Sequence, residues 1–238
     1  MKHFDFATAV NQLGLNKQLG RRIAYNRIPY WVKGEDFLRL FLPYLVIVGD
    51  SREQDKWVEK ACAYYGIGFV WAKDDIGDCL KEGDYSYKVC YGNREYNYIG
   101  KVAYERKGSV SEFYGNCTGY NSDKKTSDRE RIEREFDRFV AKKYDKVVLL
   151  LEFGEKLTDL IDMEFAFRDR TGALRTKTTG NTMYSAVKSW QQPNNKNFDV
   201  IQASDHERLF WQWVQDMYYY YRNEIRAECL AKGILERS

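Results

Sequence analysis

The chain has 238 residues, of which 44% are hydrophobic and 31% are charged, and its formal net charge is +3. This length suffices for one sizeable hydrophobic core, or for one domain with a small appendage. No run of about 18 apolar residues is present, which argues against a membrane span, and the N-terminus lacks the apolar region of a secretory signal. The five cysteines are odd in number and form no C-x-x-C pair. The sequence therefore favours a reducing, cytoplasmic location and disfavours a zinc site.

Residues 1–42 form a basic N-terminal module. They hold seven Lys or Arg and three acids, a net charge of +4, so the rest of the chain carries 3 − 4 = −1. The pattern predicts a short helix over 6–13, a second helix from Lys17 to Tyr25, and a turn and short ribbon over 27–34 before a helix at 35–42. The order resembles the winged helix of excisionase-like proteins, which implies DNA contacts through its basic residues. These candidates are Lys17, Arg21, Arg22, Arg27 and Lys33. A helical collar packed on the following domain is the alternative.

Beyond Pro43, apolar runs and helical spacings alternate along the chain. The pattern predicts strands at 45–49, 67–72, 85–90, 96–104, 147–151 and 198–202, with a hairpin signal at 92–94. It predicts helices at 55–66, 127–143 and 182–190, and a long terminal helix whose N-cap lies within 204–207. Residues 154–181 lack periodicity, so we expect a loop there. Strands that alternate with helices predict an α/β fold with a mixed sheet flanked by helices.

Three short acidic segments follow or end predicted strands. Asp50 comes directly after the first strand, Asp84 follows Gly83, and Glu105 lies two residues before Lys107 on a strand. Alternate residues of a strand share a face, so Glu105 and Lys107 are expected on the same side of the sheet. Carboxylate oxygens are the ligands that Mg²⁺ prefers, and a lysine beside the metal can orient or deprotonate a water. Gly-Asp and Glu-x-Lys each occur often by chance. The order of the three acidic segments along the chain is what predicts a magnesium site.

Four segments together resemble the XPF-type structure-specific endonuclease domain, a branch of the restriction-endonuclease-like fold. They are VIVGDSRE, EGDY, YERKGSVSEF and VVLLLE, and the resemblance covers about residues 43–222. It implies a metal-dependent endodeoxyribonuclease that uses Mg²⁺, with Mn²⁺ as a substitute, on branched or flap DNA. It assigns Asp50, Asp84 and Glu105 to the metal and makes Lys107 the catalytic lysine. Three neighbours would support the site: Arg52 and Glu53 by completing an acidic pocket, and Arg106 by holding local structure or contacting phosphate.

The resemblance also implies a homodimer, which we expect to form through the C-terminal helices. Trp211, Trp213 and the tyrosine run at 218–221 are the candidate contacts. The expected domains are the module at 1–42, the nuclease domain at 43–222 and a helical tail at 223–238. The small size and the missing accessory modules suit a phage or bacterial protein.

Two positions depart from the family pattern. Ser111 stands where an acid is expected, with Glu112 next to it as a possible substitute, and Gly49 stands before Asp50 where an apolar residue is usual. Two other functions therefore stay open. One is a catalytically silent DNA-binding or scaffold protein that keeps the nuclease fold. The other is a sequence-directed nuclease guided by the N-terminal module.

Overall fold

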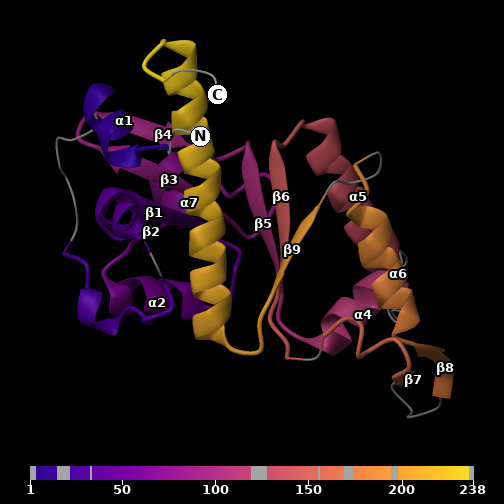
Figure 1. Ribbon diagram of the computed structural model, residues 1–238. Helices are drawn as coiled ribbons and strands as arrows, with labels where there is room; N and C mark the ends of the chain where they lie inside the picture. Colours follow the sequence, from indigo (N-terminus) through magenta and orange to yellow (C-terminus); the bar gives the residue numbers. More distant parts are fainter. Residues whose placement is uncertain are drawn as a thin grey trace. The chain divides into compact units, whose positions relative to one another are not determined.

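The structure is a computed structural model that describes residues 4–14, 22–32, 34–118, 128–154, 156–168, 174–193 and 198–235. The chain forms two compact units, whose elements are labelled in Figure 1. Unit 1 comprises Met1–Leu80, Asp84–Ile99 and Phe210–Ser238, and unit 2 comprises Lys81–Gly83 and Gly100–Leu209. Each unit is described by itself.

Unit 1 contains a mixed sheet with the strand order β2-β1-β3-β4. Its regular elements are α1 (Phe6–Gln12), a 3-10 helix (Tyr25–Arg27), a π-helical turn (Phe37–Phe41), a second 3-10 helix (Leu42–Tyr44), β1 (Leu45–Gly49), α2 (Trp57–Tyr65), β2 (Gly68–Trp71), α3 (Ala72–Ile76), β3 (Tyr85–Tyr91), β4 (Arg94–Asn97) and most of α7 (His206–Ala231). β1 pairs in parallel with β2 and antiparallel with β3, and β4 pairs antiparallel with β3. Leu45, Ile47 and Val48 are fully buried, as a continuous apolar run predicts for a strand covered on both faces.

Aromatic side chains of α7 form much of the core of unit 1. In Figure 1 this helix runs beside β1, β3 and α1. The ring of Trp213 lies 5.1 Å from that of Tyr85 on β3, and the ring of Tyr218 lies 5.9 Å from that of Phe6 on α1. Each such ring removes a large apolar area from water, so α7 ties the N-terminal segment to its own unit.

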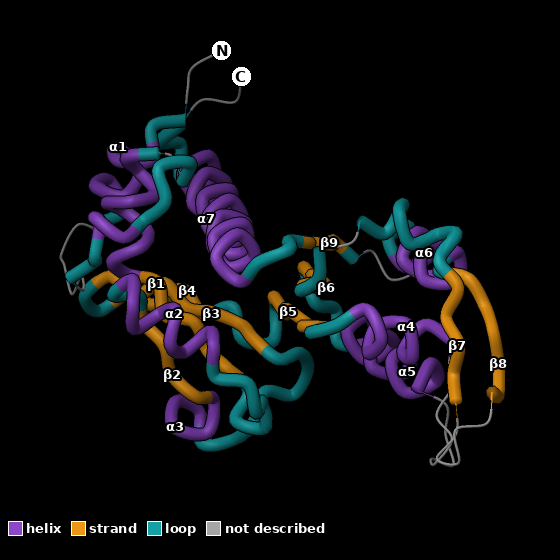
Figure 2. Tube along the Cα trace, turned by 90° about the horizontal axis from the view of Figure 1, so that it is seen from below, coloured by secondary structure: helices purple, strands orange, loops and turns teal. Residues whose placement is uncertain are grey.

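Unit 2 contains a parallel arrangement of strands and three helices. Its elements are β5 (Val102–Lys107), α4 (Val110–Thr118), α5 (Asp128–Ala141), β6 (Lys146–Leu151), β7 (Glu164–Arg168), β8 (Leu174–Thr179), α6 (Asn181–Trp190) and β9 (Asp199–Gln202). β6 pairs in parallel with β5 on one side and β9 on the other, and β7 and β8 form a separate antiparallel ribbon. α4, α5 and α6 lie together in Figure 2 and share one apolar core with Ala103 of β5 and alternate residues of β6. This core includes Ala103, Phe113, Phe136, Leu149 and Trp190.

The predicted α/β class is confirmed, and the mixed sheet with helices beside it is consistent with the expected restriction-endonuclease-like fold. Three expectations were wrong in detail. The strand predicted over 96–104 is two strands, β4 and β5, because the chain turns at Gly100 with a φ of 80°. The loop predicted over 154–181 contains the β7–β8 ribbon. The helix α4 was not predicted.

The N-terminal module differs from a simple helix-turn-helix. The second helix was predicted to reach Tyr25, yet residues 22–24 are not helical, and residues 15–21 lie outside the described part of the chain. Phe6 and Val10 of α1 are buried, which agrees with the alternative of a helical collar. The helix predicted at 35–42 continues through Pro43 as a 3-10 turn, with Pro43 in its first turn where proline is tolerated.

Two dimer contacts proposed from the sequence are excluded by burial. Trp211 and Trp213 are fully buried within the single chain, so they do not offer a surface to a partner. Of the tyrosine run, Tyr218 and Tyr221 are buried and Tyr219 is exposed. The helix α7 also passes position 222 without a break. The domain limits at 42 and 222 stay predictions.

Candidate active-site residues in the two units

The end of β1 places Asp50 at a buried position in unit 1. Its backbone N–H donates to the carbonyl of Asp84 over 2.8 Å, which joins the residue after β1 to the residue before β3. Gly49 is required here by its neighbours on β2. A Cβ at this position would lie 2.8 Å from Cζ of Phe69 and 3.0 Å from the ring of Trp71. The departure from the family pattern at Gly49 therefore has a steric cause.

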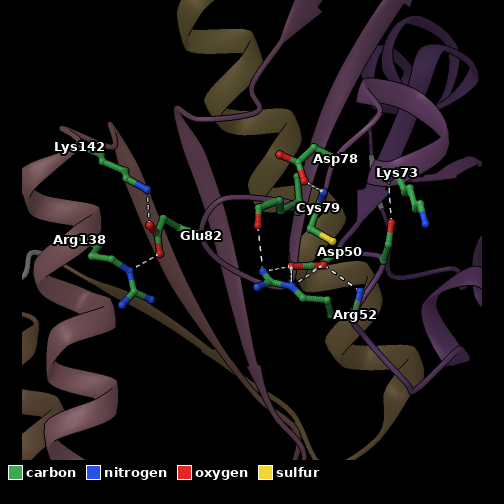
Figure 3. A network of polar contacts seen from close by, with 10 residues as sticks. Asp50, Arg52, Lys73, Asp78, Cys79, Glu82, Arg138 and Lys142 are labelled. Carbon is green, nitrogen blue, oxygen red and sulfur yellow. Dashed lines mark hydrogen bonds and ion pairs between the residues drawn. The ribbon is translucent and has the colours of Figure 1, made fainter.

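Asp50 is held by the guanidinium group of Arg52, as Figure 3 shows. Nε of Arg52 lies 3.1 Å from Oδ1 and 3.0 Å from Oδ2, and Nη2 contacts Oδ2 as well. Nη2 also donates to the carbonyl of Leu80 over 2.9 Å. The side chain of Asp50 is 5% exposed and that of Arg52 is 66% exposed. The pair thus joins a buried carboxylate to a cation that faces solvent.

Charges around Arg52 act together on its protonation. The hydrogen bond with Asp50 raises the pKa of Arg52, burial acts against this, and the nearby charge of Asp84 adds to the increase. Asp84 itself is half-buried. Glu53, predicted to complete an acidic pocket, accepts from the backbone N–H of Asp55 over 2.9 Å. This contact gives Glu53 a local role in the turn before α2.

Unit 2 contributes Glu105 and Lys107, which share a face of β5 as predicted. Nζ of Lys107 donates to Oε1 of Glu105 over 2.6 Å, and both side chains are 5% exposed. Within the described residues, Oε2 of Glu105 is a buried oxygen without a hydrogen-bond partner. A buried carboxylate oxygen in this state is costly unless a further group binds it. Glu105 and Lys107 are two residues apart on a strand, so their side chains lie on the same face. Packing around β5 buries both of them.

Arg106 lies between these two residues and is bound to the end of β6. Its Nε and Nη2 both lie 2.6 Å from Oε2 of Glu152, and His206 at the start of α7 contacts Oε1. The sequence did not place Glu152 in the site, although an acid directly after an apolar strand was a signal for it. His206 was expected to be a solvated residue in the first turn of the terminal helix rather than a catalytic base. Of the two roles expected for Arg106, holding local structure is the one that this ion pair accounts for.

Glu112 acts at the start of α4. Its Oε2 accepts from the backbone N–H of Gly108 over 3.0 Å, while the backbone N–H of Glu112 donates to Oγ of Ser109 over 3.1 Å. The Ser109 side chain caps the first turn of α4 as in a capping box. The Glu112 side chain completes only part of that motif, because it accepts from Gly108, one residue before the N-cap. The Ser-x-x-Glu spacing is the signal that would have predicted α4. The departure at Ser111 falls inside the same first turn.

The donors present fit a magnesium ion in part. The unpartnered Oε2 of Glu105 is a hard oxygen of the kind that Mg²⁺ binds. Both oxygens of Asp50 are instead taken by Arg52. Across the residues that the structure describes, no three Asp, Glu, His or Cys side chains gather closely enough to hold a metal ion.

The basic residues of the N-terminal module are only partly described. Arg22 and Arg27 are exposed, whereas Lys17, Arg21 and Lys33 lie outside the described residues. Nη1 of Arg27 donates to the carbonyl of Tyr64 at the end of α2 over 2.9 Å.

No protein-family model and no curated protein matches the chain. Among solved structures, the chain is similar to XPF from Aeropyrum pernix, at 15% identity and a TM-score of 0.43. The match covers 71% of this chain and 63% of that chain, so this chain spans less than two thirds of the solved protein. Within the described residues, no helix combines the length and apolar character needed to cross a membrane.

Proposed function

We propose that this protein is a Mg²⁺-dependent endonuclease that hydrolyses phosphodiester bonds of branched or flap DNA. The observation that carries the proposal is the buried pair of Glu105 and Lys107, in which one carboxylate oxygen remains without a partner among the described residues. Two residues of unit 1, Asp50 and Asp84, are joined by a backbone hydrogen bond and would add further carboxylates. Asp50, Asp84 and Glu105 are the proposed ligands.

Magnesium, when bound, would relieve charge on the scissile phosphate and activate a water. The protein's own residues would then position the reactants. Lys107 would hold the water or take its proton, and its cation would stabilise the negative charge that develops on phosphate. Asp50 would hold the ion through oxygens that Arg52 also contacts, so the guanidinium and the ion would compete for the same carboxylate. Mn²⁺ is expected to substitute for Mg²⁺.

One observation favours a catalytically silent DNA-binding protein instead. The Asp50 carboxylate already has a cation, Arg52, at both of its oxygens. If that ion pair persists in the presence of Mg²⁺, Asp50 stabilises the fold and does not bind metal. The experiment below separates the two functions.

The test is cleavage of a labelled panel of duplex, single-stranded, 3′-flap, splayed-arm and four-way-junction DNA with Mg²⁺ or Mn²⁺. Lys107→Met is compared with Lys88→Met. Lys88 is a matched control because it is a second buried strand lysine, paired with Asp75 at 2.5 Å. We expect cleavage of a branched substrate that Lys107→Met and Asp84→Asn abolish and Lys88→Met retains in the folded fraction. DNA binding without cleavage under either metal would exclude the enzyme and leave the silent protein.

A further inference from the structure

Exposed tyrosines and basic residues lie on the N-terminal segment 22–30 and on α2 of unit 1, and Arg27 contacts Tyr64 where the two segments meet. Ala24 N–H donates to the carbonyl of Tyr65 over 3.0 Å, and a Cβ on Gly66 would lie 2.5 Å from the carbonyl oxygen of Arg22. The segment is therefore in tight contact with the last turn of α2. We call the exposed side chains here the tyrosine–arginine surface, and its members are Arg22, Tyr25, Arg27, Tyr30, Lys60 and Tyr64.

The aromatic rings of this surface face solvent, and a hydrogen-bonded turn carries one of them. Tyr30 is 94% exposed, Tyr64 is 52% exposed and Tyr25 is 49% exposed. Tyr30 lies at the tip of a turn closed by a 3.0 Å hydrogen bond from Val32 N–H to the carbonyl of Pro29. Val32 is buried and anchors that turn. Tyrosine side chains lose little entropy on binding because only two torsions are ordered, so fixed, exposed rings are suited to contact a ligand.

Arg27, one of the cations of the surface, lies against an aromatic ring. The guanidinium of Arg27 stands 4.5 Å from the centre of the Tyr64 ring. Lys60 lies one helical turn before Tyr64, on the same side of α2. Within the described part of the chain, neither Arg22 nor Arg27 forms an ion pair with a carboxylate. In the sequence, residues 6–34 hold five Lys or Arg and no Asp or Glu, so this segment carries a positive net charge.

We infer that the tyrosine–arginine surface binds single-stranded DNA, with bases stacked on the tyrosines and phosphates at the arginines. Aromatic rings beside cations are the combination that recognises unpaired strands. A duplex keeps its base faces stacked on one another, so protruding rings have no equivalent target there. The absence of helix over 22–24 also removes part of the helix that was predicted to enter a major groove. The inference deepens the proposed function, because it adds an unpaired arm to the branched substrate.

The test is fluorescence anisotropy of the full chain with labelled oligo-dT of about 15 nucleotides, in EDTA so that no metal-dependent cleavage occurs. We expect Tyr64→Ala and Tyr30→Ala each to weaken binding by at least about fivefold, and Tyr64→Phe to retain it because the ring remains. Tyr219→Ala is the matched control, since Tyr219 is an exposed tyrosine on α7. Arg22→Gln should lower the slope of log K against log salt by about 0.7, and Arg226→Gln, an exposed arginine on α7, should not.

Wild-type binding of oligo-dT by both tyrosine-to-alanine variants would overturn the inference, as would a duplex that competes as well as oligo-dT does. Tighter binding of oligo-rU than of oligo-dT would overturn the assignment to DNA. The two proposals fail separately. A protein that binds oligo-dT through these tyrosines but does not cleave DNA would contradict only the proposed nuclease activity. An active nuclease whose Tyr64→Ala variant binds oligo-dT normally would contradict only the proposed binding surface.

Discussion

Nζ of Lys107 lies 2.6 Å from Oε1 of Glu105, two residues earlier on the same strand and equally buried. A buried ion pair contributes little net stability, because the loss of hydration offsets the attraction between the charges. Removal of one partner is much more harmful, because the remaining charge stays buried. Variants that remove one charge or both charges of the pair can therefore distinguish its effect on folding from its proposed effect on catalysis.

The first prediction concerns this pair. Lys107→Met alone should lower the free energy of unfolding by roughly 3 kcal/mol, because Glu105 is left as an unpaired buried charge. Glu105→Gln combined with Lys107→Met should restore most of that loss, since both charges are gone. Cleavage should stay absent in the double variant. Urea unfolding and a cleavage assay on the same preparations provide the check, and a double variant that cuts DNA would contradict the proposed role of Lys107.

The second prediction concerns Glu112. Its carboxylate accepts from the backbone N–H of Gly108, just before α4, so Glu112→Ala should cost about 1 kcal/mol of stability. The Mg²⁺ concentration needed for half-maximal cleavage should not change. Ser109→Ala is the matched variant, because it removes the side-chain cap on the first turn of the same helix and should have a similar cost. A higher Mg²⁺ requirement in Glu112→Ala alone would show that Glu112 belongs to the site.

The third prediction concerns Gly49. An added methyl group would meet the rings of Phe69 and Trp71 at 3.0 Å or less, so Gly49→Ala should destabilise unit 1 by about 1–3 kcal/mol. Phe69→Leu in the same chain should recover part of this loss by removing the nearest ring atom. Gly115→Ala is the control, because its Cβ meets nothing within 4 Å and alanine favours a helix by up to about 1 kcal/mol. Thermal unfolding of wild type and the three variants measures the effect. An unchanged unfolding temperature for Gly49→Ala would show that the rings of β2 move aside without cost.

The fourth prediction is a pH dependence that arises in unit 1. Burial acts to raise the pKa of Glu228, but hydrogen bonds from Lys232, Arg94 and Tyr96 outweigh it and lower the pKa to about 2, from its ordinary value of 4.5. Arg94 and Tyr96 lie 2.6 and 2.8 Å from this carboxylate. A depressed folded-state pKa contributes stability above pH 4.5, and this contribution is lost as the pH falls towards 2.

Wild type should lose roughly 1 kcal/mol of stability between about pH 4.5 and pH 2 as Glu228 becomes protonated, a value reduced for solvent screening. Glu228→Gln cannot titrate at this position, so it should lack this part of the pH dependence. Urea midpoints at several pH values measure this difference. Arg94→Ala should remove part of the same pH dependence, because it deletes one of the donors. Parallel pH curves for wild type and Glu228→Gln would contradict the assignment.

Local pattern determined much of this protein. The apolar run 45–49 predicted β1, the helical spacing of 55–66 predicted α2, and the period of two placed Glu105 and Lys107 on one face of a strand. Each of these depends on neighbours within a few residues, so the sequence alone suffices. The resemblance to the XPF-type domain likewise rests on short segments.

Tertiary structure decided the features that depend on distant partners. Trp211 and Trp213 are buried because the β-strand residue Tyr85 and other rings of unit 1 surround them, although an amphipathic helix could equally present them to a dimer partner. Arg52 bonds both Asp50 and the carbonyl of Leu80. The rings of Phe69 and Trp71 on β2 occupy the space that a Cβ at position 49 would need. Which group fills a given space depends on residues far along the chain, and single-sequence periodicity contains no information about those distances.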